Sequence, residues 1–316
     1  MWTRKLLKDN AKHILRRSYA VALAICALAG AIGAGLPNRQ NPYFFLLELQ
    51  QMLYHTGIDS SLAFGGFLGD FPMLFASGGY PQLNRLYTTY SAGLALAFFG
   101  IFAAVAACLF SSFISMPLAV GKNRAFLENR AGAPGFSGLL FPFKSNYLRI
   151  VGGMLTTKLF MGLPILLAYL VFVVLGVMGA LTYLVNIDIL FAVLLGILLV
   201  GGAVSAVLAY RWRLVPWLMA ENPFLTGTQA RQISAAVTRG EKWNIFVLDL
   251  SFLGWAILAL IPLGWGFLLL NPYIEATNAE LYAALRAKAL ARNICTAQQL
   301  PGVLPAYSWP VQPPKM

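Results

Sequence analysis

The stretch LFMGLPILLAYLVFVVLGVMGAL, residues 159–181, contains no charged side chain, and it decides the fold class of this chain. The next stretch, IDILFAVLLGILLVGGAVSAVLAY at residues 187–210, contains a single charged residue, Asp188. An α-helix rises 1.5 Å per residue, so about 20 apolar residues cross the roughly 30 Å hydrocarbon core of a bilayer. Both stretches therefore predict membrane-spanning helices.

The composition of the whole chain supports this interpretation. Of its 316 residues, 59% are hydrophobic and 11% are charged, whereas about a quarter of the residues in a soluble domain are charged. So few polar groups cannot cover a globular surface, which excludes a soluble globular protein. The net charge of +12 comes from basic residues between the apolar runs. That distribution is typical of membrane-protein loops and not of a nucleic-acid-binding domain.

Further apolar runs occupy residues 19–36, 90–114, 243–260 and 264–282. Pro262 and Gly264 separate the last two runs, because proline removes a backbone donor and glycine permits a turn. We predict an all-α polytopic bundle of six transmembrane spans. The alternative is five spans, with one long kinked helix over residues 243–282.

The distribution of basic residues predicts the orientation of the bundle. Lys and Arg are concentrated before residue 19, between residues 115 and 158, between residues 211 and 242, and after residue 282. Six spans place all of these segments on one side of the membrane, and the positive-inside rule makes that side cytoplasmic. We therefore expect a multi-pass protein of the bacterial cytoplasmic membrane with both termini in the cytoplasm.

The chain divides into one membrane domain, residues 1–294, and a Pro-rich irregular tail, residues 295–316. The outer loop at residues 37–89 contains apolar segments that are too short to span. We expect them to form interfacial or re-entrant helices, or a cap over the bundle.

A second short amphipathic element is predicted between the fourth and fifth spans. Thr226 and Gln229 have the spacing of a capping box, which predicts a helix over residues 228–239. Ala230, Ile233 and Val237 would form its apolar stripe, against the inner membrane face or against the bundle.

Two ionisable residues, Lys158 and Asp249, lie inside apolar runs. Charged groups at membrane depth are costly and often functional. Counting along the helices from the flanking basic residues places both about 10 Å into the bilayer. We expect them to share an intramembrane polar site. In the alternative, each has a separate structural role and Lys158 extends its side chain to the headgroups.

No pattern of a catalytic or metal site is present in the sequence. It contains no GxSxG, HExxH or P-loop, and its histidines are His13 and His55 alone. The three cysteines form no CxxC. We therefore expect no catalytic residue, no metal, no cofactor and no enzymatic activity.

A series of short motifs runs through most of the chain: VGKNRAFL at residues 120–127, LFPFK at 140–144, AENP at 220–223, GEKWNIF at 240–246, LSFLGW at 250–255 and NPY at 271–273. With these motifs the chain resembles a family of bacterial integral membrane proteins known as "domain of unknown function 975". The residues that carry the resemblance are Gly121, Asn222, Pro223, Gly240, Lys242, Ser251, Gly254, Trp255, Pro272, Tyr273 and Tyr282.

Three of these motifs have physical interpretations of their own. Asn222-Pro223 should end the helix that leaves the fourth span, because the residue before proline avoids the α region. Ser251 and Gly254 are small residues at helical spacing, suited to close packing against a neighbouring helix. Asn271-Pro272 should break or kink the sixth span.

The resemblance implies no activity, because none is assigned to the family. We expect a non-enzymatic helical bundle with a role in the cell envelope. Its partners would be the lipid bilayer, another protein or a second copy of the chain, and not nucleic acid. The first rival hypothesis is a transporter or exporter component with a polar site at Lys158 and Asp249. The second is a membrane-embedded enzyme acting on lipid.

Overall fold

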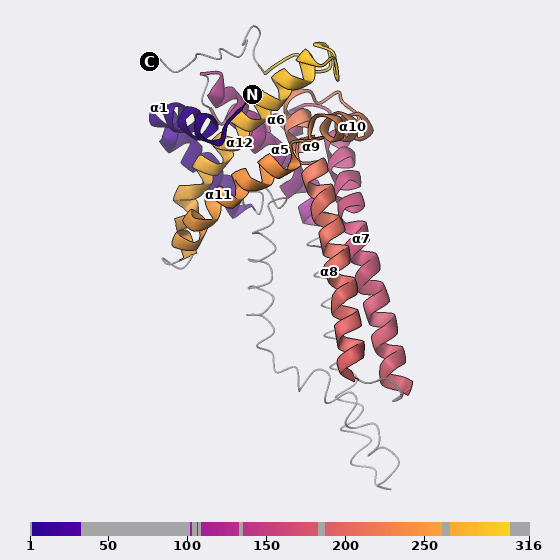
Figure 1. Cartoon of the computed structure of the whole chain (residues 1–316). Helices are drawn as coiled ribbons and strands as arrows, with labels where there is room; N and C mark the ends of the chain where they lie inside the picture. Colours follow the sequence, from indigo (N-terminus) through magenta and orange to yellow (C-terminus); the bar gives the residue numbers. More distant parts are fainter. Residues whose placement is uncertain are drawn as a thin grey trace, which may run out of the picture. The chain divides into compact units, whose positions relative to one another are not determined.

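The computed structural model describes residues 2–32, 102, 106, 109–132, 135–182, 187–260 and 266–303, and in this part of the chain it contains helices and no strands (Figure 1). The compact unit described here comprises Met1–Asn41 and Ser112–Met316. The helices are α1 (Arg4–Ala31), the π-helix η3 (Ser111–Ser115), α5 (Met116–Arg130), α6 (Ser137–Lys144), α7 (Tyr147–Thr182), α8 (Ile187–Arg211), α9 (Val215–Glu221), α10 (Gly227–Val237), α11 (Lys242–Leu260) and α12 (Gly266–Ala291).

Helix α1 joins an amphipathic segment to an apolar one. Leu7, Ala11 and Leu15 repeat every four residues and are buried, while basic residues cover the other face of this first half. The backbone leaves helical geometry at Ser18 (φ −138°, ψ 18°), where the amphipathic half meets the apolar run. The described part of the predicted first span, residues 19–32, therefore falls on the second half of a longer, kinked helix, and residues 33–36 lie outside the described residues.

Helices α7 and α8 lie side by side along their length and carry exposed apolar side chains (Figure 1). They correspond to the predicted spans at residues 159–181 and 187–210, and α7 begins 12 residues earlier than predicted, at Tyr147. Their contact is close because α8 presents a glycine to α7. A Cβ added at Gly201 would lie 2.5 Å from the Cβ of Ala168.

Four helical segments among the described residues are long and apolar enough to cross a membrane: Arg4–Ala31, Tyr147–Leu175, Leu195–Glu221 and Lys242–Ala259. Six spans are therefore not confirmed. Most of the predicted second span, residues 90–114, and the outer loop, residues 37–89, lie outside the described residues. The predicted sixth span, residues 264–282, falls on α12, which is not among the four.

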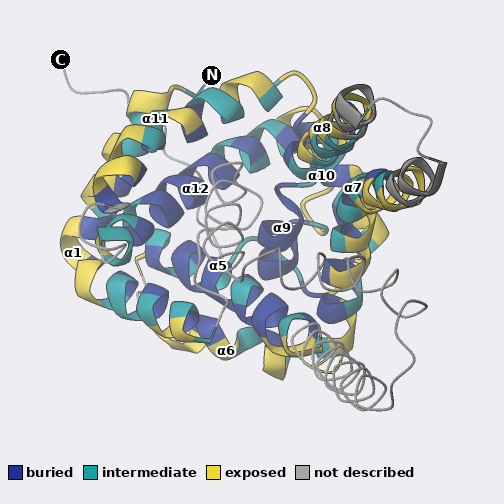
Figure 2. Ribbon diagram, turned by 90° about the horizontal axis from the view of Figure 1, so that it is seen from below, coloured by how far each residue is buried: buried dark blue, intermediate teal, exposed yellow. Residues whose placement is uncertain are grey.

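Helix α12 is the central helix of this unit. It packs against α1, α5, α10 and α11, and it lies among the buried ribbons of α5 and α9 in Figure 2. The two runs of the predicted hairpin fall on two helices, α11 and α12, that contact each other, and the predicted turn at residues 261–265 lies outside the described residues. The buried residues of α12 include the polar residues Asn271, Glu275, Thr277, Asn278 and Glu280. This polar lining explains why α12 does not have the composition of a span.

The expected break at Asn271-Pro272 is absent, and α12 continues through Pro272. Proline has no N–H, so in the turn before Pro272 the carbonyl oxygen of Leu268 loses its helical donor. In that turn, the Tyr19 hydroxyl of α1 donates a hydrogen bond to the carbonyl oxygen of Leu269 at 3.0 Å. A side chain from a neighbouring helix thus helps to satisfy the backbone next to the proline, as packed helices commonly do.

The capping box and the end signal at Asn222-Pro223 are confirmed. The Thr226 hydroxyl accepts from the backbone N–H of Gln229, and the Gln229 side chain accepts from the N–H of Thr226. Ala230, Ile233 and Val237 are buried, and α10 packs against α7, α9 and α12. Helix α9 ends at Asn222, whose side-chain oxygen accepts from the N–H of Phe224.

The tail predicted at residues 295–316 is irregular but packed over its described part. Leu300 is buried in the core, and the carbonyl oxygen of Gln299 accepts a hydrogen bond from Asn222 at 3.0 Å. Residues 304–316 lie outside the described residues.

Two glycines of the motifs have opposite surroundings. A Cβ at Gly121 of α5 would lie 2.0 Å from the carbonyl oxygen of Leu139 in α6, so the two helices touch through this glycine. A Cβ at Gly254 of α11 would meet nothing within 4 Å, and Gly254 is exposed. The expected close packing at Gly254 is therefore wrong for the described residues, and the close approach lies at Gly121.

We predict that Gly121→Ala destabilises the protein, since the added methyl group meets backbone that cannot move away cheaply. Overpacking of this kind costs about 1–3 kcal/mol. The matched control is Gly254→Ala, which should be neutral or stabilising by up to about 1 kcal/mol because alanine favours helix. Thermal unfolding of the detergent-solubilised protein measures both. Equal melting temperatures for the two variants would contradict this packing of α5 on α6.

Candidate functional site

A buried ion pair joins α5 to α12. The Nζ of Lys122 lies 2.6 Å from Oε1 of Glu275, and the two side chains are 2% and 1% exposed. The other carboxylate oxygen of Glu275 is buried and has no hydrogen-bond partner among the described residues. Lys122 belongs to the VGKNRAFL motif, and in the sequence it resembles any other basic residue of a loop.

A second pair lies further along the same two helices. The Nε of Arg130 donates to Oε1 of Glu280 at 2.6 Å, and Asn10 of α1 donates to Oε2 at 3.3 Å. One carboxylate of α12 therefore connects three helices.

Asp249 of α11 lies in the interior, as expected, and the partner that the structure gives it is Arg213. The Arg213 guanidinium donates to both carboxylate oxygens of Asp249, and its Nη2 lies 2.7 Å from Oδ1. The hydroxyl of Tyr210 donates to Oδ2 at 3.1 Å, and Arg213 also donates to Oδ1 of Asn278 in α12 at 3.0 Å. Arg213 is buried in the turn between α8 and α9.

The partner of Asp249 could not be read from the sequence. Arg213 follows an apolar run, and its position in the sequence is that of a basic residue in a cytoplasmic loop. Lys158, the residue expected beside Asp249, is half-buried on α7. Its pairing with Asp249 stays a prediction. The sequence signal for Arg213 is its position. It is a basic residue between the end of α8, at Arg211, and the start of the apolar helix α9, at Val215.

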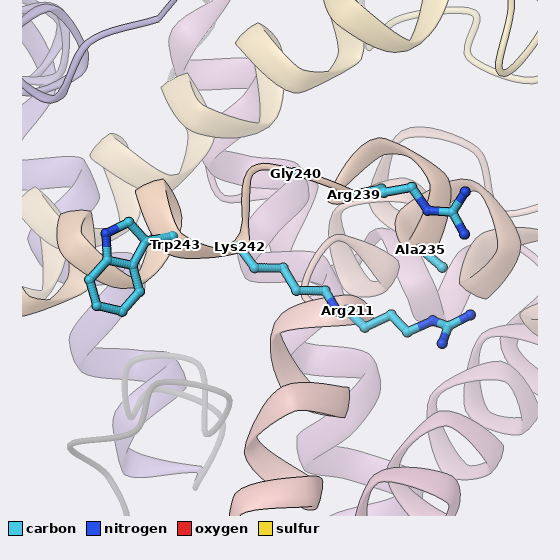
Figure 3. A pocket seen from close by; sticks show the side chains of 6 residues that line it. All are labelled: Arg211, Ala235, Arg239, Gly240, Lys242 and Trp243. Atoms are coloured by element: carbon cyan, nitrogen blue, oxygen red, sulfur yellow. The ribbon is translucent and has the colours of Figure 1, made fainter.

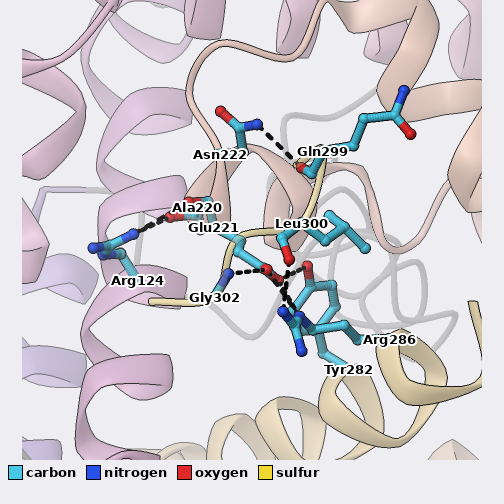
Figure 4. A network of polar contacts seen from close by, with 9 residues as sticks. All are labelled: Arg124, Ala220, Glu221, Asn222, Tyr282, Arg286, Gln299, Leu300 and Gly302. Atoms are coloured by element: carbon cyan, nitrogen blue, oxygen red, sulfur yellow. Dashed lines mark hydrogen bonds and ion pairs between the residues drawn. The ribbon is translucent and has the colours of Figure 1, made fainter. Parts of the chain in front are cut away.

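The fourth buried carboxylate, Glu221 at the end of α9, is the centre of the network in Figure 4. Its Oε1 accepts from Nε of Arg286 at 2.8 Å and from the N–H of Gly302 at 2.7 Å. Its Oε2 accepts from the Tyr282 hydroxyl at 2.5 Å. Arg286 also donates to the carbonyl oxygen of Leu300 at 2.7 Å. The network thus fastens the segment after α12 to α9 and α12.

Arg124 of α5 extends this network to a fourth element. It donates to the carbonyl oxygens of Ala220 and Glu221 at 3.1 and 3.3 Å (Figure 4), and it pairs with Glu128 at 2.8 Å. Burial raises the pKa of the Cys295 thiol close by, and the negative charge of Glu221 adds to this effect. Cys295 is therefore a protonated, buried side chain at neutral pH and not a reactive thiolate.

The remaining motif residues lie in different environments. Ser251 donates to the carbonyl oxygen of Leu248, its neighbour one turn earlier in α11, and its own carbonyl oxygen accepts from Lys8 at 3.3 Å. Tyr273 packs edge-on against Phe252, with ring centroids 5.6 Å apart. Trp255 is exposed on α11. The structure brings Asn222 and Tyr282 together around the Glu221 network, whereas Gly240 and Lys242 belong to a different place.

Gly240 and Lys242 line a pocket of about 410 Å³ between the end of α8 and the start of α11 (Figure 3). Its lining residues are Arg211, Ala235, Arg239, Gly240, Lys242 and Trp243. Gly240 has φ +81°, a left-handed conformation that favours glycine and lets the chain turn from α10 into α11. We call this cavity the basic pocket. Among the described residues, no group of three or more His, Cys, Asp or Glu side chains could hold a metal ion.

Comparison with known proteins supports one relationship. The sequence model of a family described as "Protein of unknown function (DUF975)" matches residues 84–289. This range includes every motif residue named above. No curated protein and no solved structure matches the chain.

We predict that Asp249→Asn lowers stability by about 3–5 kcal/mol, because it leaves a buried guanidinium without its carboxylate. Adding Arg213→Met should recover part of this loss, since neither charge is then left alone. Adding Lys158→Met instead should recover less, because the Arg213 guanidinium is then still without its carboxylate. Chemical or thermal unfolding in detergent measures the three variants. Recovery with Lys158→Met and none with Arg213→Met would overturn the assignment of Arg213 as the main partner.

Proposed function

The chain belongs to the DUF975 family of proteins of unknown function, and from this premise we propose that it is a non-enzymatic integral membrane protein that acts by binding membrane lipid. It sits in the cytoplasmic membrane of a bacterium in this proposal. A protein partner or a second copy of the chain is the alternative ligand for the same apolar surface.

The observation that carries this proposal is an inverted distribution of charged and apolar side chains. The buried ion pairs lie inside, with Lys122, Glu275, Asp249 and Arg213 as examples. Large apolar side chains lie outside, as with Leu199 of α8, which is 66% exposed. Water-soluble domains have the opposite arrangement, whereas lipid solvates apolar surface and disfavours exposed charge.

The use of the buried carboxylates supports binding over catalysis. Glu221, Asp249, Glu275 and Glu280 each accept hydrogen bonds from a basic side chain of another element. A carboxylate held in this way is committed to connecting helices, and it is poorly placed to exchange protons with a substrate. The apolar faces of α7, α8 and α11 remain as the surface available for a ligand, and lipid is the ligand that such faces fit.

The orientation follows from the basic residues at the helix ends. Arg211 ends α8 and Lys242 begins α11, so these two ends carry positive charge. The positive-inside rule places such ends in the cytoplasm, and the basic first half of α1 belongs on the same side. Both termini are cytoplasmic in this arrangement.

A transporter component is the second candidate function, and one observation favours it. Oε2 of Glu275 is buried next to Lys122 and has no hydrogen-bond partner among the described residues. An acidic group with a free buried oxygen is a feature of ion and proton paths. Proton flux into vesicles that contain the protein and a trapped pH dye separates the two candidates. Flux that Glu275→Gln abolishes would favour transport, and our proposal expects no flux above that of protein-free vesicles.

The lipid-binding proposal predicts that the protein stays in the membrane after carbonate washing and retains phospholipid through purification in mild detergent. Native mass spectrometry measures the retained lipid. Vesicles of phosphatidylglycerol and phosphatidylethanolamine should keep their composition during incubation with the protein. Release by carbonate, or a purified protein free of lipid, would contradict membrane lipid binding, and turnover of vesicle lipid would favour the lipid-acting enzyme.

The orientation predicts where membrane-impermeant thiol reagents react. Single cysteines placed at Lys5 and Arg292 in a cysteine-free background should be protected in intact cells and react after permeabilisation. A cysteine at Asp59 should react in intact cells. Labelling of the Arg292 position from outside would contradict a cytoplasmic C-terminus.

A further inference from the structure

The basic pocket lies between the end of α8 and the start of α11, and both helices contribute to candidate membrane spans, Leu195–Glu221 and Lys242–Ala259. Arg211 is the last residue of α8 and Lys242 is the first of α11, and Arg239 lies in the turn that precedes α11. In Figure 3 the Lys242 side chain extends toward Arg211, and the Arg239 guanidinium lies on the same side of the cavity as that of Arg211. A membrane interface would cross the chain at this level, since both spans begin or end there.

The three cations of the pocket differ from the buried basic side chains of the unit because no carboxylate holds them. Lys122, Arg130 and Arg213 are held by carboxylates. Arg211, Arg239 and Lys242 take part in no ion pair within the described part of the chain, and the lining contains no acidic residue. The pocket therefore concentrates three positive charges without an internal counter-ion.

The acidic residue nearest in sequence is turned to another partner. Glu241 stands between Gly240 and Lys242, and its carboxylate accepts from Lys288 of α12 at 2.6 Å and from Asn244 at 3.1 Å. Since Lys288 neutralises Glu241, the charge of the pocket is left uncompensated. A single ion pair thus keeps a possible internal anion away from the site.

The volume of the pocket fits a lipid headgroup, and an exposed tryptophan lies next to it. Its volume of about 410 Å³ lies within the range of small-ligand sites, roughly 300–1,000 Å³. Trp243 is 71% exposed and packs at a tilt against Phe246, with ring centroids 5.3 Å apart, and its indole points away from the two arginines (Figure 3). Exposed tryptophan is typical of the headgroup level of a membrane, where its ring contacts lipid and its N–H remains near water.

We propose that the basic pocket binds the phosphate of an anionic phospholipid headgroup, with Arg211, Arg239 and Lys242 as its ligands and Trp243 beside the acyl chains. Arginine donates to phosphate oxygens in pairs, and lysine adds a point charge. Three cations match a lipid with net negative charge better than a zwitterionic one. The inference rests on the proposed function and deepens it by naming the lipid class and the site.

The test measures binding of soluble short-chain lipids to the intact, detergent-solubilised protein. Dihexanoyl phosphatidylglycerol is compared with dihexanoyl phosphatidylcholine and with inorganic phosphate. The site variant combines Arg211→Gln, Arg239→Gln and Lys242→Gln. The matched control combines Lys5→Gln, Arg16→Gln and Arg17→Gln, which removes the same charge from exposed positions of α1. Arg239→Gln alone serves as a milder variant, because its side chain lies in an exposed turn.

We expect the wild type to prefer phosphatidylglycerol, and the site variant to lose roughly 100-fold in affinity for it, at about fivefold per basic residue. Arg239→Gln alone should lose about fivefold. The control should change by less than about threefold, because Lys5, Arg16 and Arg17 do not line the pocket and act on the lipid only at longer range, where salt screens their charge. Equal losses in the site and control variants would overturn the proposal in favour of general charge attraction. Saturation by inorganic phosphate with the affinity of the lipid would assign the pocket to free phosphate.

The two proposals fail in different ways. Equal affinities of the wild type and the site variant for phosphatidylglycerol would overturn the proposed binding site. Lipid binding at another place in the protein would not be contradicted by that result. A wild type that binds neither lipid would overturn the proposed function as well. Melting temperatures and gel-filtration profiles of the variants confirm that each one is folded, and a misfolded triple variant leaves Arg239→Gln to decide.

Discussion

Pairing of charges around α12 is the constraint on which the rest of the unit depends. An unpaired charge in an apolar interior costs several kcal/mol, so each buried carboxylate must meet a cation as the helices pack. Glu275 and Glu280 of α12 can do so only if α5 runs alongside and presents Lys122 and Arg130. The register of α5 against α12 is thereby set at two points, and α1 joins through Asn10.

The same requirement organises the helices that follow α8. Arg213 has to reach Asp249 of α11 and Asn278 of α12 together, which holds the turn between α8 and α9 against both helices. Glu221 then gathers Tyr282, Arg286 and the backbone of Gly302. The irregular segment after α12 is held against the helices because the carbonyl oxygen of Leu300 and the N–H of Gly302 take part in this network.

Basic residues inside the unit and basic residues at its surface thus have different roles. Those inside the unit connect helices, and their charge is cancelled where they stand. Arg211, Arg239 and Lys242 stay at the surface near the ends of two candidate spans, where no carboxylate of the described residues pairs with them. Their positive charge is not cancelled within the described part of the chain, which is why we assign the binding of an external anion to them.

The sequence by itself determined the elements whose signals are local. Apolar runs located α7, α8 and α11, and the capping box located α10, because helix length, hydropathy and caps depend on neighbouring residues. The motifs also identified the family over residues 84–289. The interior position of Asp249 followed in the same way, from the cost of a carboxylate within an apolar run.

Only the tertiary structure decided which charges meet and which glycine the packing needs. Lys122 and Glu275 are 153 positions apart, and in the sequence Lys122 looks like any basic residue of a loop. Arg213 became the partner of Asp249, and α12 became a central helix with a polar lining where the sequence predicted a span. Gly121, and not Gly254, lies at a helix contact. The physical reason is that burial and pairing belong to the packed helices together, and a charge acquires its partner only when distant segments are brought side by side.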